Sequence, residues 1–151
     1  MPSSPRSLAK SPKNVLITGP PGIGKTTLIM KLVRSLLPYG PVGFCTREIR
    51  EEGVRKGFEL VSLDEKTGVL AHVGIGGPHR VGKYGVDISG FERFLGGINF
   101  LGSEHMVIVI DEIGKMECLS PVFVDMLGRL LDASKPVVAT IALKAGRPLQ
   151  R

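Results

Sequence analysis

The sequence feature that most constrains the fold is the glycine-rich stretch Gly19-Pro-Pro-Gly-Ile-Gly-Lys-Thr26, which fits the pattern G-x-x-x-x-G-K-[ST]. It follows a short apolar run at residues 15–17 and precedes residues 26–37, whose apolar side chains recur at helical spacing. A strand, a glycine-rich loop and a helix in this order form a phosphate-binding loop, because backbone N–H groups surround an anion at the positive end of the helix dipole. The stretch therefore predicts a phosphate site between a buried strand and a helix.

Two side chains at the end of this loop indicate a nucleotide site. Lys25 is long enough to reach the β- and γ-phosphates, and the hydroxyl of Thr26 is a ligand suited to Mg²⁺. A plain turn between a strand and a helix needs neither residue. We therefore expect a nucleoside triphosphate to bind here together with Mg²⁺.

The rest of the chain has the pattern of an α/β fold. Apolar runs predict strands at residues 42–46, 55–62, 69–73, 106–110 and 137–141, the second and third of which form a hairpin. Ser89 and Glu92 predict a capping box for a helix that ends near Gly102, and Ser120 followed by Pro121 predicts a helix to about residue 131. The glycine-rich residues 74–85 are expected to be an irregular loop. This order predicts a three-layer fold with a mainly parallel central sheet.

Two carboxylates follow the most apolar of these predicted strands. Asp111 and Glu112 come directly after residues 106–110, and ligands of open α/β sheets bind at the carboxyl ends of the strands. We expect Asp111 to hold Mg²⁺ opposite Thr26, directly or through water, and Glu112 to polarise the water that attacks the γ-phosphate. A kinase, which transfers phosphate to a bound hydroxyl, does not need the second acid, so the pair favours hydrolysis. No N-K-x-D triad follows, and no other feature selects a base, which indicates relaxed nucleotide choice.

Four basic side chains are candidates to stabilise the negative charge that develops on the γ-phosphate. Lys115 follows the acid pair by three residues, and Arg47 ends a predicted strand. Arg80 and Lys83 lie on the glycine-rich loop, which could close over phosphates. Lys115 and Arg47 are the stronger candidates for a catalytic role.

The charge distribution favours an anion site with a basic tail over a nucleic-acid surface. The net charge of +6 comes from residues 1–47, which hold seven basic and no acidic side chains, whereas the remainder holds 13 basic and 14 acidic ones. Residues 1–13 are expected to be a disordered basic tail before a single domain at 14–151. Nucleic-acid binding by this tail stays a minor alternative, as does organellar targeting.

Other classes of site and location are disfavoured. The longest apolar run, residues 106–110, is far too short to span a membrane, and no secretory signal is recognisable. We therefore expect a cytoplasmic protein without a membrane partner. Cys45 and Cys118 have no ligand spacing with the histidines, which argues against zinc. Gly74-Ile-Gly-Gly77 lacks the third glycine of a dinucleotide fingerprint.

Longer blocks carry a resemblance to a known family. Besides the phosphate loop these are Val42-Gly-Phe-Cys-Thr-Arg-Glu-Ile-Arg50, Gly57-Phe-Glu-Leu-Val61, Val81-Gly-Lys-Tyr-Gly-Val-Asp87 and Ile110-Asp-Glu-Ile-Gly-Lys-Met-Glu117. Together they resemble the THEP1-like, or cancer-related, nucleoside-triphosphatases. The resemblance implies a RecA-like P-loop fold and slow Mg²⁺-dependent hydrolysis of ATP, GTP and other nucleoside triphosphates. We expect the protein to be a monomer. The resemblance places nucleotide binding on Gly19, Pro20, Pro21, Gly22, Ile23, Gly24, Lys25, Thr26 and Thr27, and on Ile108, Val109, Ile110, Asp111, Glu112, Ile113, Gly114 and Lys115.

The resemblance also leaves alternatives open. Family members continue past the last predicted strand with a further helix–strand–helix portion, so we expect the C-terminal part of the fold to be missing. A small nucleotide or nucleoside kinase is the alternative within enzymes, since Gly-Pro-Pro-Gly loops occur there too. A nucleotide-binding regulatory module with little turnover is the alternative outside them. Too few residues are present for the helical lid of an AAA+ motor.

Overall fold

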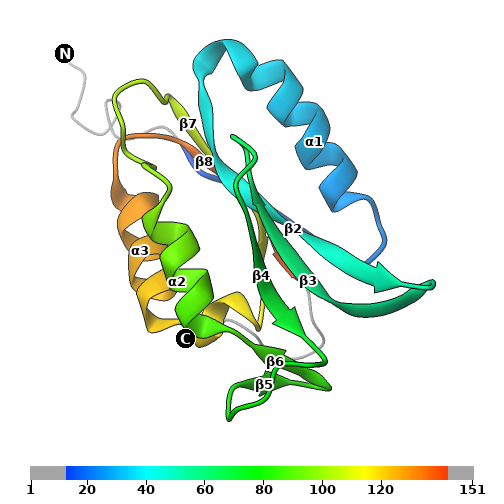
Figure 1. Ribbon diagram of the computed structural model, residues 1–151. Helices are drawn as coiled ribbons and strands as arrows, with labels where there is room; N and C mark the ends of the chain where they lie inside the picture. Colours follow the sequence, from blue (N-terminus) through cyan, green and yellow to red (C-terminus); the bar gives the residue numbers. More distant parts are fainter. Residues whose placement is uncertain (1–12, 143–151) are drawn as a thin grey trace, which may run out of the picture.

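The computed structural model describes residues 13–142 (Figure 1). The expected disordered tail lies outside this range except for Lys13, as does the end of the predicted domain, residues 143–151. The ammonium of Lys13 donates to the carbonyl of Lys135 at 2.9 Å, so this residue is attached to the domain. Across residues 13–142, no helix combines the length and apolar character needed to span a bilayer.

The described strands form one eight-stranded sheet in the order β1-β8-β7-β2-β3-β4-β6-β5. The strands are β1 (Val15–Gly19), β2 (Pro41–Glu51), β3 (Val54–Ser62), β4 (Thr67–His72), β5 (Arg80–Val81), β6 (Tyr84–Val86), β7 (Val107–Ile113) and β8 (Val137–Ala142). The pairings β1–β8, β8–β7 and β7–β2 are parallel, and the other four are antiparallel. The parallel half brings the carboxyl ends of β1, β8, β7 and β2 to one edge of the sheet.

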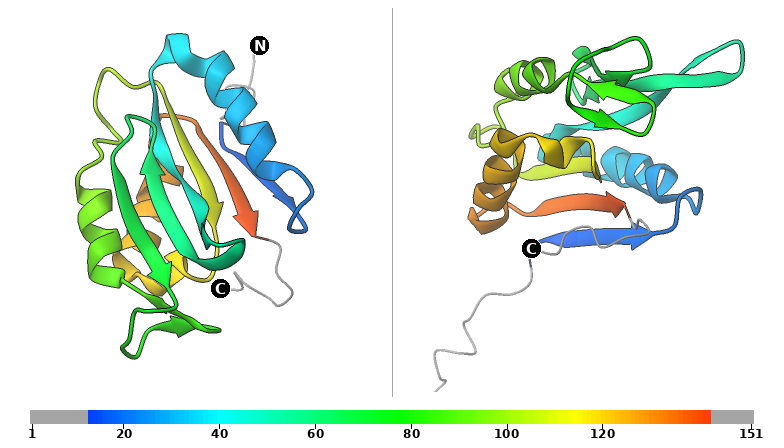
Figure 2. Two further views of the ribbon diagram at one scale, coloured as in Figure 1. Left: turned by 45° about the vertical axis from the view of Figure 1, so that its right-hand side comes forward. Right: turned by 90° about the horizontal axis from the view of Figure 1, so that it is seen from below.

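Helices cover both faces of the sheet, which gives the three layers expected from the sequence (Figure 2). Helix α1 (Lys25–Leu36) lies on one face against β1, β7 and β8. Helices α2 (Ile88–Gly96) and α3 (Pro121–Asp132) lie together on the other face. Short 3-10 turns, η2 (Leu37–Tyr39) and η3 (Glu117–Leu119), lead into β2 and α3.

One predicted helix cap is confirmed and the other is wrong. Ser120 caps α3 as expected, because its hydroxyl oxygen accepts the N–H of Phe123 at 3.0 Å. The cap of α2 is Asp87, whose carboxylate accepts the N–H of Gly90 at 2.9 Å. Ser89 lies inside the helix, and Glu92 accepts a 2.6 Å hydrogen bond from the hydroxyl of Ser120. The helix thus begins two residues earlier than the predicted capping box, with Asp87 as its cap, and α2 ends at Gly96, before the expected Gly102.

The sheet is mixed and not mainly parallel as the sequence analysis expected, because four of its seven pairings are antiparallel. The strand expected at residues 42–46 continues to Glu51 and turns back into β3. The hairpin expected between residues 55–62 and 69–73 is confirmed as β3–β4. The loop expected at residues 74–85 contains the short hairpin β5–β6, in which Arg80 pairs with Gly85 and Val81 with Tyr84. The end of β2 from Arg47 carries mostly charged, exposed side chains, so a hydrophobicity pattern does not show it. The β5–β6 hairpin was hidden by the glycines around it, although Tyr84 and Val86 of β6 are buried in the core.

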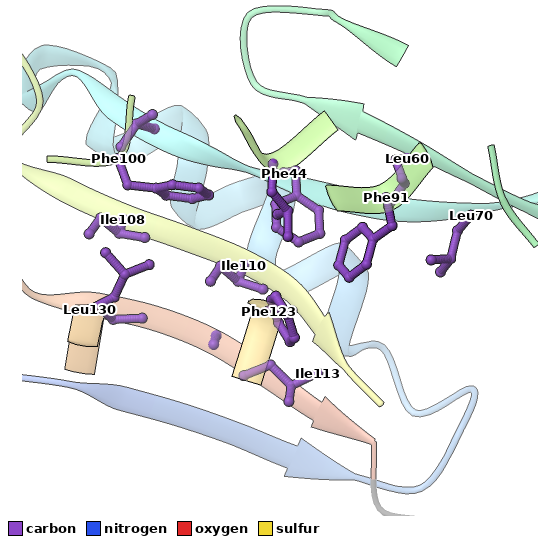
Figure 3. Close-up of a cluster of buried hydrophobic side chains, with 14 of the residues drawn as sticks. Phe44, Leu60, Leu70, Phe91, Phe100, Ile108, Ile110, Ile113, Phe123 and Leu130 are labelled. Carbon is purple, nitrogen blue, oxygen red and sulfur yellow. The ribbon is translucent and has the colours of Figure 1, made fainter. Parts of the chain in front are cut away.

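The core between the sheet and helices α2 and α3 is centred on phenylalanines (Figure 3). The ring centroids of Phe44 and Phe91 are 6.1 Å apart, and those of Phe91 and Phe123 are 5.3 Å apart. Beside Phe44, a Cβ on Gly43 would lie 1.7 Å from the carbonyl oxygen of Val109, so β2 can pair with β7 here only through a glycine. The packing of β2 against β7 fixes the strand edge that carries the acid pair.

Candidate active site: the phosphate pocket

A cavity of about 950 Å³ opens at the carboxyl edge of the parallel strands, and we call it the phosphate pocket. Its first wall comes from the loop between β1 and α1 and from the first turn of α1, through Pro21, Gly22 and residues 24–27. Its floor is the segment from Glu112 to Leu119, and its far wall comes from the β2–β3 hairpin with Leu70 and Val81. The strand order puts the loop and the hairpin on opposite sides of β7, so the acid pair lies between them.

The β1–α1 loop has the geometry of an anion-binding loop. Gly22 has φ 81° and Gly24, the N-cap of α1, has φ 106°, conformations that glycine adopts without a Cβ penalty. No side chain caps α1, so the N–H groups of its first turn are free of side-chain acceptors. The ammonium of Lys25 donates to the carbonyls of Gly19 and Pro20, at 2.7 and 3.2 Å. The loop therefore presents N–H groups, a helix N-terminus and an ammonium together, as phosphate binding requires.

A β-bulge separates the two acids of the pair. Strand β7 pairs with β8 from Ile108↔Val137 to Asp111↔Thr140, and the next partners are Ile113↔Ile141. Glu112 is the extra residue and has φ 154°, which side chains rarely adopt. Bulges of this kind re-aim side chains next to active sites. Here Glu112 lines the phosphate pocket, and Asp111 is buried behind it.

The surroundings set the protonation of Glu112. Partial burial raises the pKa of its carboxyl, and the charge of Asp111 acts in the same direction. The ammonium of Lys25 opposes both effects, which places this cation within electrostatic reach of Glu112. A carboxylate with a raised pKa is a stronger proton acceptor than one in water.

Asp111 is held by one hydrogen bond and has one oxygen to spare. The hydroxyl of Thr140 donates to Oδ1 of Asp111 at 2.6 Å, and Asp111 is 1% exposed. Within residues 13–142, Oδ2 of Asp111 is the buried side-chain oxygen without a hydrogen-bond donor. Such an atom is costly unless a donor reaches it, and water bound to a metal ion supplies one. The site thus fits a hard cation held with the hydroxyl of Thr26 on α1.

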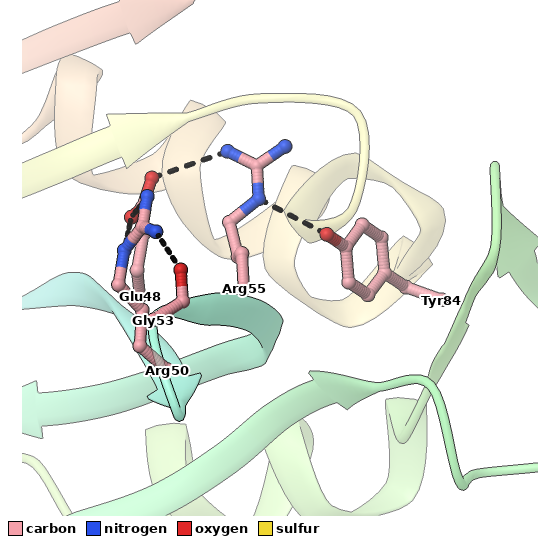
Figure 4. A network of polar contacts seen from close by, with 5 residues as sticks. All are labelled: Glu48, Arg50, Gly53, Arg55 and Tyr84. Carbon is pink, nitrogen blue, oxygen red and sulfur yellow. Dashed lines mark hydrogen bonds and ion pairs between the residues drawn. The ribbon is translucent and has the colours of Figure 1, made fainter.

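The far wall carries a polar cluster that the sequence analysis missed (Figure 4). Arg55 donates to Glu48 at 3.1 Å and to the hydroxyl of Tyr84 at 3.0 Å, and its guanidinium lies 5.3 Å from the ring centroid of Phe58. Arg55, Glu48 and Phe58 all line the pocket. The period of two along β2 could have indicated Thr46 and Glu48 as neighbours on one face, because side chains of a strand alternate.

Comparison with known proteins decides the family. The sequence profile of the NTPase family matches residues 14–151. Nucleoside-triphosphatase THEP1 of Thermotoga sp. (strain RQ2) is 48% identical over 130 residues, which cover 84% of this chain and 72% of that protein. The chain belongs to the NTPase family. The human cancer-related nucleoside-triphosphatase is 40% identical over 152 residues, covering 91% of this chain and 79% of that protein.

Solved structures of the NTPase family share the fold. The crystal structure of THEP1 from Aquifex aeolicus matches with a TM-score of 0.73 and 33% identity, over 90% of this chain and 80% of that one. The solution structure of a human cancer-related nucleoside triphosphatase matches with a TM-score of 0.73 and 38% identity, over 91% of this chain and 79% of that one. The predicted P-loop α/β fold and the predicted family are therefore confirmed.

Within this NTPase fold, the site residues expected from the sequence divide into three groups. The first group lines the phosphate pocket: Pro21, Gly22, Gly24, Lys25, Thr26, Thr27, Glu112, Ile113, Gly114 and Lys115. Gly19, Pro20 and Ile23 belong to the same loop but are not among the lining residues, and Asp111 is buried. Ile108, Val109 and Ile110 are buried in the sheet and support the acids from behind. Arg47 is not brought to the pocket: its guanidinium is exposed and pairs with Glu59 at 3.3 Å.

The two cations of the glycine-rich segment also lie away from the pocket lining. Arg80 donates to the carbonyls of Ile75 and Lys83, at 3.0 and 2.9 Å, which closes the β5–β6 hairpin. The ammonium of Lys83 lies 5.6 Å from the ring centroid of Tyr84. Val81 is the residue of this hairpin that lines the pocket.

Proposed function

We propose that this protein hydrolyses nucleoside triphosphates to nucleoside diphosphate and phosphate with the help of Mg²⁺. The observation that carries the proposal is that a phosphate-binding loop with Lys25 and a proton-accepting Glu112 face one pocket. Relatives that are 40–48% identical are named nucleoside-triphosphatases, which supports the same activity. ATP, GTP and other triphosphates are expected as substrates, because the sequence offers no base-selective motif.

The loop and α1 bind the triphosphate in this proposal. Backbone N–H groups from Gly22 to Thr26 donate to phosphate oxygens, and Lys25 exchanges its carbonyl partners for the β- and γ-phosphates. Thr26 and Asp111 are the residues that would hold Mg²⁺. When bound, the ion neutralises charge on the β- and γ-phosphates.

Glu112 then acts on the attacking water. Its carboxylate orients the water and accepts one proton while the water oxygen bonds to the γ-phosphorus. The bond from that phosphorus to the β-phosphate oxygen breaks, and the electron pair leaves with the diphosphate. The raised pKa of Glu112 makes its carboxylate a stronger proton acceptor than an ordinary one.

Lys115 is the cation that we assign to the developing charge. It is exposed on the floor of the pocket, next to the acid pair, and has no ion-pair partner within residues 13–142. Arg55 is already paired with Glu48, and Arg47 with Glu59. A free ammonium beside the phosphates can therefore follow the charge as it forms.

The proposal is tested by phosphate release from ATP, GTP, CTP and UTP, with and without Mg²⁺. We expect all four to be hydrolysed only with Mg²⁺, at rates within about tenfold of one another. Adding nucleosides tests the kinase alternative, which requires labelled phosphate to appear on the nucleoside faster than in solution. Tight binding of ATP without phosphate release would instead favour the regulatory module.

A further inference from the structure

Glu117 is a buried acid in the floor of the phosphate pocket. The proposed hydrolysis mechanism assigns it no role. Glu117 opens η3, five residues after Glu112, and its side chain is 3% exposed. No basic side chain pairs with it within residues 13–142. A carboxyl group buried without a cation costs free energy, so its contacts should explain why it is there.

The side chain of Glu117 joins two parts of the pocket. Its Oε1 accepts the N–H of Gly114 at 3.1 Å, and its Oε2 accepts the hydroxyl of Thr46 at 3.3 Å. The first contact closes the turn after β7, which also has a hydrogen bond from the N–H of Cys118 to the carbonyl of Gly114 at 3.0 Å. The second contact ties this turn to β2. Glu117 thus restrains the segment 114–116, which carries Lys115.

Gly114 links Glu117 to Glu112. A Cβ built on Gly114 would lie 3.3 Å from Oε2 of Glu112 and 3.3 Å from Oε1 of Glu117, so both carboxylates pack against this one residue. Glu112 itself has φ 154°. Such a backbone conformation persists only where neighbouring contacts hold it, and the bond from Glu117 acts two residues away.

We infer that Glu117 is a positioning residue for hydrolysis, which places Glu112 and Lys115 by holding the turn between them. The inference rests on the proposed function. Glu117 acts through the backbone of Gly114 and does not itself touch the phosphates.

The protonation of Glu117 supports this role. Burial raises its pKa to about 7, the charge of Glu112 acts in the same direction, and the N–H of Gly114 and hydroxyl of Thr46 oppose the shift. The other titratable groups nearby are Cys118 on the same turn and Lys25, Glu48, Arg55 and Lys115 around the pocket. At pH below about 7 the side chain is neutral: Oε1 still accepts the N–H of Gly114, and the protonated Oε2 donates to the hydroxyl of Thr46. It then holds the turn without adding negative charge near the phosphates.

The experiment compares Glu117→Ala and Glu117→Gln with the wild type. We expect Glu117→Ala to lower kcat about tenfold or more while KM for Mg·ATP changes less than about threefold, since the binding loop is untouched. Glu117→Gln keeps an acceptor for Gly114 and should retain kcat within about threefold of the wild type below pH 7. The wild-type kcat should fall as the pH rises through about 7, because Glu117 then gains a charge, and the Gln variant should lack this fall.

Glu92→Gln is the matched control, because Glu92 is a half-buried acid of α2 that accepts from Ser120, outside the pocket lining. Unchanged kcat in Glu117→Ala, or an equal loss in both Glu117 variants, would overturn the inference while wild-type hydrolysis stands. Hydrogen exchange of the Gly114 amide provides a readout without turnover. It should be faster in Glu117→Ala than in Glu117→Gln, and equal rates would also overturn the inference. Absence of wild-type hydrolysis would instead count against the proposed function.

Discussion

Thr140 and Asp111 form a 2.6 Å hydrogen bond between adjacent strands, with the threonine hydroxyl as donor. Both side chains are at most 1% exposed. The bond uses Oδ1 of Asp111 and leaves Oδ2 for a metal-bound water, so β8 orients the acid that we assign to Mg²⁺.

Replacing Thr140 tests this orientation. Thr140→Val removes the donor, and we expect the Mg²⁺ concentration for half-maximal phosphate release to rise about 10- to 100-fold. Thr140→Ser keeps the hydroxyl and should stay within about threefold of the wild type. An unchanged Mg²⁺ dependence in the valine variant would show that Thr140 does not orient the acid.

Lys115 and Arg47 were the two leading candidates by sequence, with Lys115 the better positioned, and the structure separates them. Lys115→Ala should reduce kcat about 100-fold, which is the scale for losing one group that stabilises a developing negative charge. Arg47→Ala removes an exposed pair with Glu59 and should reduce kcat much less. Steady-state kinetics on both variants decides between them, and a larger loss in the arginine variant would contradict the assignment.

The buried Glu117 predicts how stability depends on pH. The unfolded chain loses this proton near its ordinary pKa of 4.5, whereas the folded protein keeps it to about 7. The folded state therefore binds more protons between these values, and the free energy of unfolding falls as the pH rises through this window. Glu117→Gln removes that loss, so its stability relative to wild type should improve by about 3 kcal/mol between pH 4.5 and 7.5. Urea unfolding at both pH values measures this, and a constant difference would argue against a raised pKa.

The close packing around Gly43 predicts that adding one methyl group there strongly destabilises the fold. Gly43→Ala would place a Cβ 1.7 Å from the carbonyl oxygen of Val109, which forces β2 away from β7. We expect a loss of roughly 3 kcal/mol or more, at the upper end of single substitutions. Gly128→Ala in α3 meets no atom within 4 Å and should stabilise the protein by about 0.5–1 kcal/mol. Thermal unfolding of the two variants should therefore shift in opposite directions, and similar shifts would contradict the close packing.

The sequence was sufficient for the parts of the site that depend on local backbone chemistry. The loop from Gly19 to Thr26 and the strand before Asp111 are continuous segments, so their patterns identify both structure and position. The bulge at Glu112 could not be predicted, because it depends on the register between β7 and β8. Thr140 was missed for the same reason, as its partner lies 29 residues away.

The sequence analysis also missed the part of β2 that extends beyond the core. The extension of β2 to Glu51 carries charged residues, so its hydrophobicity pattern predicted no strand there. The pairing of this extension with β3 brings Arg55 to the pocket. Arg47 lies on the same strand as Thr46 and Glu48 but alternates with them, so it misses the pocket. Which arginine of the β2–β3 hairpin reaches the pocket therefore depends on the sheet topology.

The most direct test of the account separates nucleotide binding from turnover. Mg²⁺-dependent phosphate release and ATP affinity should be measured for the wild type, Lys25→Ala and Glu112→Gln. The account predicts that Glu112→Gln binds Mg·ATP within about threefold of wild type but releases phosphate about 100-fold more slowly, because only proton transfer is lost. Lys25→Ala should weaken binding as well as hydrolysis. Equal rates of phosphate release in all three proteins would contradict the account.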